Sequence, residues 1–147
     1  VIEIIDFEKF DIKKVVNEYK KLKVDEIIVK KMHNWGGELY SIDKSTKKPG
    51  ICTFPWYALT ILWDGSVVLC PQDFYGILEI GNIKENSLFE IWNNEKMKKI
   101  RAKMSRRDYK DLKPCNNCDR IWREQFLGVP GEFLTTFLKE NILGYKK

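Results

Sequence analysis

The stretch from Cys52 to Cys70, CTFPWYALTILWDGSVVLC, decides the fold of this chain. Two apolar runs, Ala58 to Leu62 and Val67 to Leu69, flank a polar turn that contains Asp64-Gly65. Asp-Gly is favoured in tight hairpin turns because glycine adopts positive φ without a Cβ clash. The pattern predicts a β-hairpin whose antiparallel strands bring Cys52 and Cys70 back toward each other.

The remaining two cysteines lie in a short motif further along the chain, Cys115-Asn116-Asn117-Cys118. A C-x-x-C turn directs two thiolates at one point, so it can complete a site that the hairpin begins. These are all the cysteines of the chain, and no other set of residues offers a comparable ligand set. The sequence therefore predicts one metal centre, with the ligands Cys52, Cys70, Cys115 and Cys118.

Three kinds of site can use four cysteines. Disulfides are disfavoured because nothing marks secretion and the chain is long enough not to need covalent staples. A structural four-cysteine zinc-binding domain without a redox role is an alternative, although zinc sites usually pair two short knuckles and only Cys115 and Cys118 form one. An iron–sulfur cluster takes the same four thiolates.

Length and composition indicate a cytoplasmic, soluble piece of a longer protein. The chain has 147 residues, of which 44% are hydrophobic and 32% charged, and no apolar run approaches a membrane span. It begins at Val1, directly in a strand-like run and without a signal peptide. We expect no membrane association.

The first forty residues predict a β-α-β unit. Val1 to Ile5 and Glu26 to Val29 form apolar strands, and apolar residues between Ile12 and Leu22 recur at helical spacing. Two strands joined by a helix pair in parallel. Such a pair leaves its edges bare, so neighbouring β-α repeats are expected outside this chain. The loop after it contains His33, the only histidine, which we interpret as a hydrogen-bonded loop residue rather than a catalytic one.

Beyond the polar linker 41–50 and the hairpin, the sequence predicts four further elements. Leu78 to Ile80 indicates a short strand, and Ser87-Leu88-Phe89-Glu90 is a capping box that starts one helix. Arg120 to Leu127 is a short helical candidate, ended by Gly128 to Gly131, and a final amphipathic helix is expected over 133–143. The predicted core side of the capped helix consists of Leu88, Ile91, Trp92, Ile100 and Met104.

The opposite face of the capped helix is the densest basic run of a chain with formal net charge +5. Nucleic-acid binding would use such a face, but no aromatic residues are interleaved with its charges. We therefore expect a solvated helix face and no nucleic-acid partner.

The ordered motifs resemble the C-terminal auxiliary-cluster domain of radical S-adenosylmethionine enzymes, known as the SPASM or twitch domain. The resemblance is carried by Cys52, Trp56, Asp64-Gly65, Cys70, Asp73, Gly81-Asn82-Ile83, Ser87-Leu88, Ile91-Trp92 and Cys115-x-x-Cys118. It implies an α+β fold: a terminal β-α-β piece of a partial (β/α)6 barrel over residues 1–45, then a twitch domain over 46–147. In the twitch domain, a β-hairpin and helices surround a cluster held by four cysteines.

The resemblance also implies a function. The radical motif C-x-x-x-C-x-x-C is absent from the printed sequence, so the chain alone carries no catalytic residues and would be part of a radical oxidoreductase or maturase. The four cysteines would bind one auxiliary 4Fe-4S cluster, which relays or accepts an electron during oxidation or modification of a peptide or small molecule. S-adenosylmethionine and a second 4Fe-4S cluster are expected only in the full-length enzyme. The missing barrel of the same protein is the expected partner.

Two expectations concern the surroundings of the cluster. Lys113, Arg120 and Arg123 are close to the C-x-x-C motif in sequence, and their charge would favour the more reduced state of an anionic cluster. Five aromatic residues near the first two cysteines could line a substrate-facing surface, but we expect them to form a dry packing shell: Trp56, Tyr57, Trp63, Phe74 and Tyr75.

Overall fold

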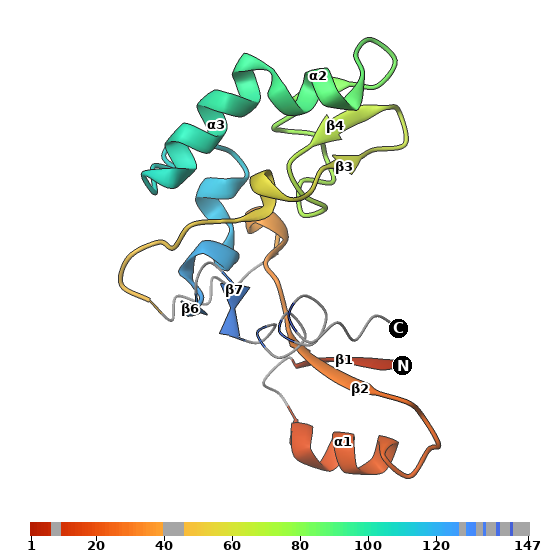
Figure 1. Cartoon of the computed structure of the whole chain (residues 1–147). Helices are drawn as coiled ribbons and strands as arrows, with labels where there is room; N and C mark the ends of the chain where they lie inside the picture. The colour runs from red at the N-terminus through yellow and green to blue at the C-terminus, as the bar shows by residue number, and fades with distance from the viewer. Residues whose placement is uncertain are drawn as a thin grey trace. The chain divides into compact units, whose positions relative to one another are not determined.

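The computed structural model describes residues 1–6, 10–39, 46–126 and 129–131, together with Leu134, Leu138 and Ile142. The chain forms two compact units, Val1–His33 and Asn34–Lys147, which are described separately below (Figure 1). Within the described part, every helix is too short or too polar to cross a bilayer.

The first unit is the predicted β-α-β element. Strands β1 (Ile2–Asp6) and β2 (Ile27–Lys31) pair in parallel, from Ile2 opposite Ile27 to Asp6 opposite Lys31. Helix α1 (Ile12–Tyr19) connects them and ends before Leu22, the predicted boundary. Asp11 caps α1, because its carboxylate accepts hydrogen bonds from two backbone N–H groups of the first turn.

The predicted hairpin is confirmed in the second unit. Strands β3 (Thr60–Ile61) and β4 (Ser66–Val68) are antiparallel, with Thr60 opposite Val68. Gly65 has φ +92°, a left-handed conformation in the turn that glycine adopts without strain. Asp64 stabilises the turn by accepting the backbone N–H of Ser66 at 3.0 Å. The hairpin thus forms for the reasons that its sequence suggests.

The strand predicted at Leu78 to Ile80 is wrong in position. The third strand of this sheet is β5 (Gly81–Asn82), which pairs antiparallel with β4 through Val67 and Gly81. The Asp73 carboxylate accepts the backbone N–H groups of Ile77 and Leu78, both at 2.8 Å. Because these two N–H groups bond to the Asp73 side chain, they cannot pair with a neighbouring strand, and strand pairing starts only at Gly81.

Two helices replace the single one that the capping box predicts. Ser87 and Glu90 form the capping box as expected and start α2 (Leu88–Asn93). Asn94 then adopts an extended conformation, with ψ 164°, and caps α3 (Glu95–Ser105) by accepting the backbone N–H of Met97 at 2.8 Å. The Asn94 side chain also donates to the carbonyl of Ile80 at 2.8 Å, so the break joins the helices to the loop before β5.

The core of the second unit lies between the β4–β5 strands and the helices. Ile91 of α2 packs against Gly81 of β5, where an added Cβ would lie only 2.9 Å from Cγ1 of Ile91. Leu88, predicted to face the core, is 47% exposed, which corrects that expectation. The buried cluster comprises Val67, Leu69, Ile80, Ile91, Met97, Ile100, Met104, Tyr109, Leu112 and Ile121.

The segment after the C-x-x-C motif departs from the prediction. Asp119–Trp122 forms one 3-10 turn, and Gln125–Phe126 is strand β6, which pairs antiparallel with β7 (Val129–Pro130). The helix predicted from Arg120 to Leu127 is therefore wrong, because the chain becomes extended at Arg123, where ψ is 149°. Most of the final helix expected over 133–143, and linker residues 41–45, lie outside the described residues.

Candidate metal centre

Three separate segments of the second unit supply the four cysteines. Cys52 precedes the 3-10 turn Phe54–Trp56, and Cys70 follows the end of β4. Cys115 begins the 3-10 turn Cys115–Asn117, whose closing bond runs from the Cys118 N–H to the Cys115 carbonyl at 3.2 Å. Cys52 and Cys115 pack against the buried apolar cluster. All four are free thiols that are buried or half-buried.

The four thiols lie within electrostatic reach of one another. Burial is the main cause that raises the pKa of each, to about 11 for Cys70 and about 12 for Cys118. Charge on the neighbouring cysteines adds to this effect: Cys52 raises the pKa of Cys70, and the pKa of Cys115 is raised by all three others. Four thiolates here would repel one another, so their joint ionisation needs a compensating cation.

Backbone N–H groups prepare three of the thiols for negative charge. Hydrogen bonds from the N–H of Phe54 to Cys52 and of Arg120 to Cys118 lower the thiol pKa values and oppose the effect of burial. Cys70 receives such bonds from Gln72 and Asp73. Amide donors of this kind stabilise sulfur that carries negative charge, whether it is a free thiolate or a metal ligand.

The arrangement of the four thiols fits a centre with several metal atoms better than a single metal ion. Within the described ranges, no group of three or more histidine, cysteine, aspartate or glutamate side chains is already placed to hold one metal ion. The charge on one thiol nevertheless raises the pKa of others, and backbone N–H groups lower the pKa of three of them. Soft sulfur donors without histidine are the set that iron–sulfur clusters and zinc prefer.

Of the basic residues expected near the site, Arg120 lies within electrostatic reach of Cys52 and lowers its pKa. Its guanidinium also stacks over the Phe54 ring, 4.7 Å from the centroid. Arg123 is instead buried in an ion pair with Asp119, 2.6 Å between Nη2 and Oδ2. The positive charge that reaches the thiols is therefore that of Arg120, which acts on Cys52.

Tyr109 fixes the position of Cys52, a role that the sequence did not suggest. Its hydroxyl accepts the N–H of Cys52 at 2.9 Å and donates to the carbonyl of Gly50 at 3.0 Å. Burial, and then charge on the neighbouring cysteines, raises the pKa of Tyr109 to about 12. The hydroxyl thus stays protonated at neutral pH and can hold both bonds.

A loop formed by residues 34–37 holds the C-x-x-C motif. Asn34, fully buried, donates from Nδ2 to the Asn117 carbonyl at 2.6 Å. Gly37, with φ +99°, approaches so closely that an added Cβ would lie 2.5 Å from the Cβ of Asn117. Gly36 likewise leaves only 2.8 Å between a built Cβ and the Cβ of Pro114. The Gly-Gly pair was the available sequence signal for this contact. His33, just before the loop, belongs to the first unit, and its role stays a prediction.

The aromatic residues expected to shield the site are exposed. Trp63, at the tip of the hairpin, is 99% exposed, and Tyr75 is 68% exposed. Phe74 stacks on Tyr75 with 4.3 Å between centroids and meets Trp35 edge-on at 6.0 Å. The dry packing shell predicted for Trp56, Tyr57, Trp63, Phe74 and Tyr75 is therefore wrong, because these side chains lie on the surface.

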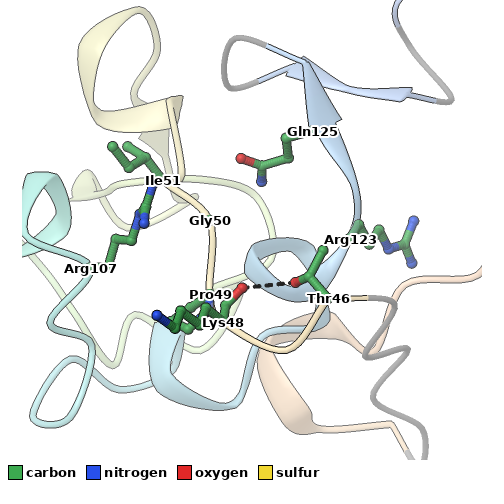
Figure 2. A pocket seen from close by; sticks show the side chains of 8 residues that line it. All are labelled: Thr46, Lys48, Pro49, Gly50, Ile51, Arg107, Arg123 and Gln125. Atoms are coloured by element: carbon green, nitrogen blue, oxygen red, sulfur yellow. Dashed lines mark hydrogen bonds between the residues drawn. The ribbon is translucent and has the colours of Figure 1, made fainter.

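A cavity of about 350 Å³ lies beside the 46–51 segment (Figure 2). Thr46 is one of its lining residues, and its hydroxyl donates to the Lys48 carbonyl at 2.8 Å. Figure 2 shows that the Arg123 guanidinium and the Gln125 side chain point away from each other, so they do not converge on one ligand position. The cavity is lined by Thr46, Lys48, Pro49, Gly50, Ile51, Arg107, Arg123 and Gln125, and none of the four cysteines contributes to it.

Comparison with known proteins finds a match for the segment that carries this site. Residues 52–119, the segment bounded by the first cysteine and the residue after the last, match the SPASM iron–sulfur cluster-binding domain. The S-adenosyl-L-methionine-dependent 2-deoxy-scyllo-inosamine dehydrogenase of Niallia circulans is 33% identical over 92 residues, which cover 61% of this chain and 36% of that protein.

A solved structure shares the fold. The crystal structure of BtrN in complex with AdoMet and 2-DOIA matches 80% of this chain and 49% of its own, with a TM-score of 0.54 and 21% sequence identity. The fold is thus a small mixed α/β arrangement of short sheets and few helices, similar to BtrN. The chain spans about half or less of the length of these relatives.

Proposed function

We propose that Cys52, Cys70, Cys115 and Cys118 bind one auxiliary 4Fe-4S cluster within residues 52–119, the segment that matches the SPASM iron–sulfur cluster-binding domain. The observation that carries the proposal is the convergence of four buried or half-buried thiols from three segments, where charge on neighbouring cysteines raises the pKa of Cys70, Cys115 and Cys118. Such a set is stable as thiolates only around a cationic centre.

When bound, a 4Fe-4S cluster supplies a one-electron redox centre. Four cysteines fill the outer position of every iron, so no iron is open to a substrate. The role of these cysteines is then to hold the centre in place, keep water away and stabilise its negative charge. An electron relay or acceptor fits that role better than a Lewis acid does.

The first unit supports a wider assignment. A parallel pair of strands with a connecting helix, such as β1–β2 with α1, is the unit from which β/α barrels are built. We infer that residues 1–45 end the partial barrel of a radical S-adenosylmethionine enzyme and that 46–147 form its auxiliary domain. The barrel of the same protein would bind S-adenosylmethionine and a further cluster. The substrate would be a peptide or a small molecule.

A structural zinc site is the second candidate, because zinc takes the same four thiolates. It would fasten the hairpin to the C-x-x-C motif without redox chemistry. The two candidates differ in geometry: zinc draws its four sulfurs to within about 4 Å of one another, since Zn–S bonds are about 2.3 Å and tetrahedral.

Anaerobic redox titration of the chain separates these possibilities. We expect a brown protein that takes up about one electron per cluster reversibly, with an EPR signal in the reduced state. A variant with all four cysteines replaced by alanine should bind neither iron nor sulfide. A colourless wild-type protein that holds zinc and accepts no electron would overturn the redox role.

A further inference from the structure

Gln72 contacts two cysteines that come from different segments of the site. Its backbone N–H hydrogen-bonds to the sulfur of Cys70, and its side-chain Oε1 lies 3.1 Å from the Cys118 sulfur. Both Gln72 and Cys118 are only 9% exposed, so water competes little for this contact. Gln72 thus bridges the end of the hairpin and the C-x-x-C motif.

We propose that Gln72 is a positioning residue whose side-chain amide donates a hydrogen bond to the sulfur of Cys118 when Cys118 ligates the cluster, and so raises the cluster's reduction potential. This inference rests on the proposed function, because it requires Cys118 to be a ligand.

The side-chain amide of Gln72 must rotate when Cys118 binds metal, because its oxygen now accepts the hydrogen bond of the Cys118 thiol. In the structure, the Cys118 thiol donates a hydrogen bond to Gln72 Oε1. A metal-bound cysteine is a thiolate and has no proton to donate, so an amide oxygen at this place would face a second acceptor. Rotation about the terminal side-chain bond of Gln72 exchanges Oε1 for the Nε2–H₂ donor without moving the backbone, and this torsion has two nearly equivalent orientations.

A donor at this sulfur changes the redox balance. Reduction adds an electron to an already anionic cluster, and a hydrogen bond to a ligating sulfur stabilises the added negative charge. The bond should be strong, because the pair is buried. Removing the amide should therefore favour the oxidised state.

The test uses the wild-type chain and the near-isosteric variant Gln72→Met, both loaded anaerobically with a cluster. Potentials are measured by EPR-monitored redox titration. The matched control is Gln125→Met, because Gln72 and Gln125 are the two glutamines of the chain and the Gln125 amide instead donates to the Arg120 carbonyl at 3.2 Å. We expect the midpoint potential to shift to more negative values in Gln72→Met and to stay at the wild-type value in Gln125→Met.

A second measurement does not depend on the variant's ability to hold a cluster. Wild-type chain is labelled with glutamine carrying ¹⁵N in the side-chain amide, and the reduced cluster is studied by pulsed EPR. We expect a ¹⁵N coupling that persists in Gln125→Met. A cluster-bearing wild type without this coupling, or an unchanged potential in Gln72→Met, overturns the inference and leaves the proposed function intact. A wild type that binds no cluster overturns both.

Discussion

Asn34 and Asp119 hydrogen-bond to each other in both directions across 85 residues of sequence. The Asp119 N–H donates to Asn34 Oδ1 at 2.9 Å, and the Asn34 N–H donates to Asp119 Oδ2 at 3.3 Å. Both residues are almost fully buried, at 0% and 1% exposure. Because Asp119 directly follows Cys118, this pair fixes the end of the C-x-x-C motif against the 34–37 loop.

Replacing Asn34 should weaken this anchor. Asn34→Ala removes the acceptor of the Asp119 N–H and the donor to the Asn117 carbonyl. We expect the free energy of unfolding to fall by about 2–4 kcal/mol, since each buried polar group that loses its partner costs about 1–3 kcal/mol. Urea denaturation measures the change. Asn86→Ala, at an exposed position, is the control and should stay within about 0.5 kcal/mol of wild type. Equal stability of the two variants would contradict the anchor.

Position 37 should tolerate no side chain, because Gly37 lies so close to Asn117. Gly37→Ala places a Cβ about where Asn117 already lies and keeps φ at +99°. We expect a loss of about 1–3 kcal/mol from the left-handed backbone alone, and faster release of iron from the loaded chain. Gly131→Ala is the control, since the nearest atom to its added Cβ is 4.0 Å away. Iron release at the wild-type rate in Gly37→Ala would show that this contact does not support the site.

The capping box of α2 should make part of the stability depend on pH. Hydrogen bonds from the Ser87 N–H and hydroxyl hold the pKa of Glu90 below its ordinary value. A carboxyl whose pKa is lowered by folding stabilises the fold above its unfolded pKa, and this contribution is lost as pH falls through the folded pKa. Wild type should thus lose more stability than Glu90→Gln between about pH 5 and about pH 3. Thermal melts at both pH values check this, and parallel losses would argue against a role of the ionised Glu90.

Removal of the metal should affect the two units differently. The cysteines join the hairpin to the C-x-x-C motif across the segment from Cys70 to Cys115, so losing their common centre frees a long loop. The second unit should melt at lower temperature after anaerobic chelation, while the helix of the first unit stays largely intact. Hydrogen exchange measured residue by residue distinguishes the units. Unchanged thermal stability after chelation would speak against the fastening role.

Local signals in the sequence predicted the elements that they control. The Asp64-Gly65 turn and the Ser87–Glu90 capping box each satisfy their own backbone groups within a few residues, and both appear as expected. The break at Asn94 was not predicted, because the Asn94 side chain bonds to Ile80, 14 residues away. The helix expected after Arg120 failed similarly, because that segment pairs as β6 with β7.

The candidate site shows the same division. The four cysteines are proposed as ligands from their spacing, since thiols are few and their chemistry is specific, and the structure places them within electrostatic reach of one another. The residues that hold them, Asn34, Gln72 and Tyr109, are of common types, and their partners lie far away in sequence. The exposure of Trp63 could not be predicted either, because no local sequence pattern shows whether an apolar side chain at a hairpin tip is buried.

The central claim is that Cys52, Cys70, Cys115 and Cys118 together bind one 4Fe-4S cluster. Mössbauer spectroscopy of the chain loaded anaerobically with ⁵⁷Fe and sulfide tests it most directly. We predict the spectrum of a single cluster with about four irons and four sulfides per chain, and loss of that spectrum when all four cysteines are alanine. A spectrum of isolated tetrathiolate iron without bound sulfide, or an intact cluster in the cysteine-free variant, would contradict the account.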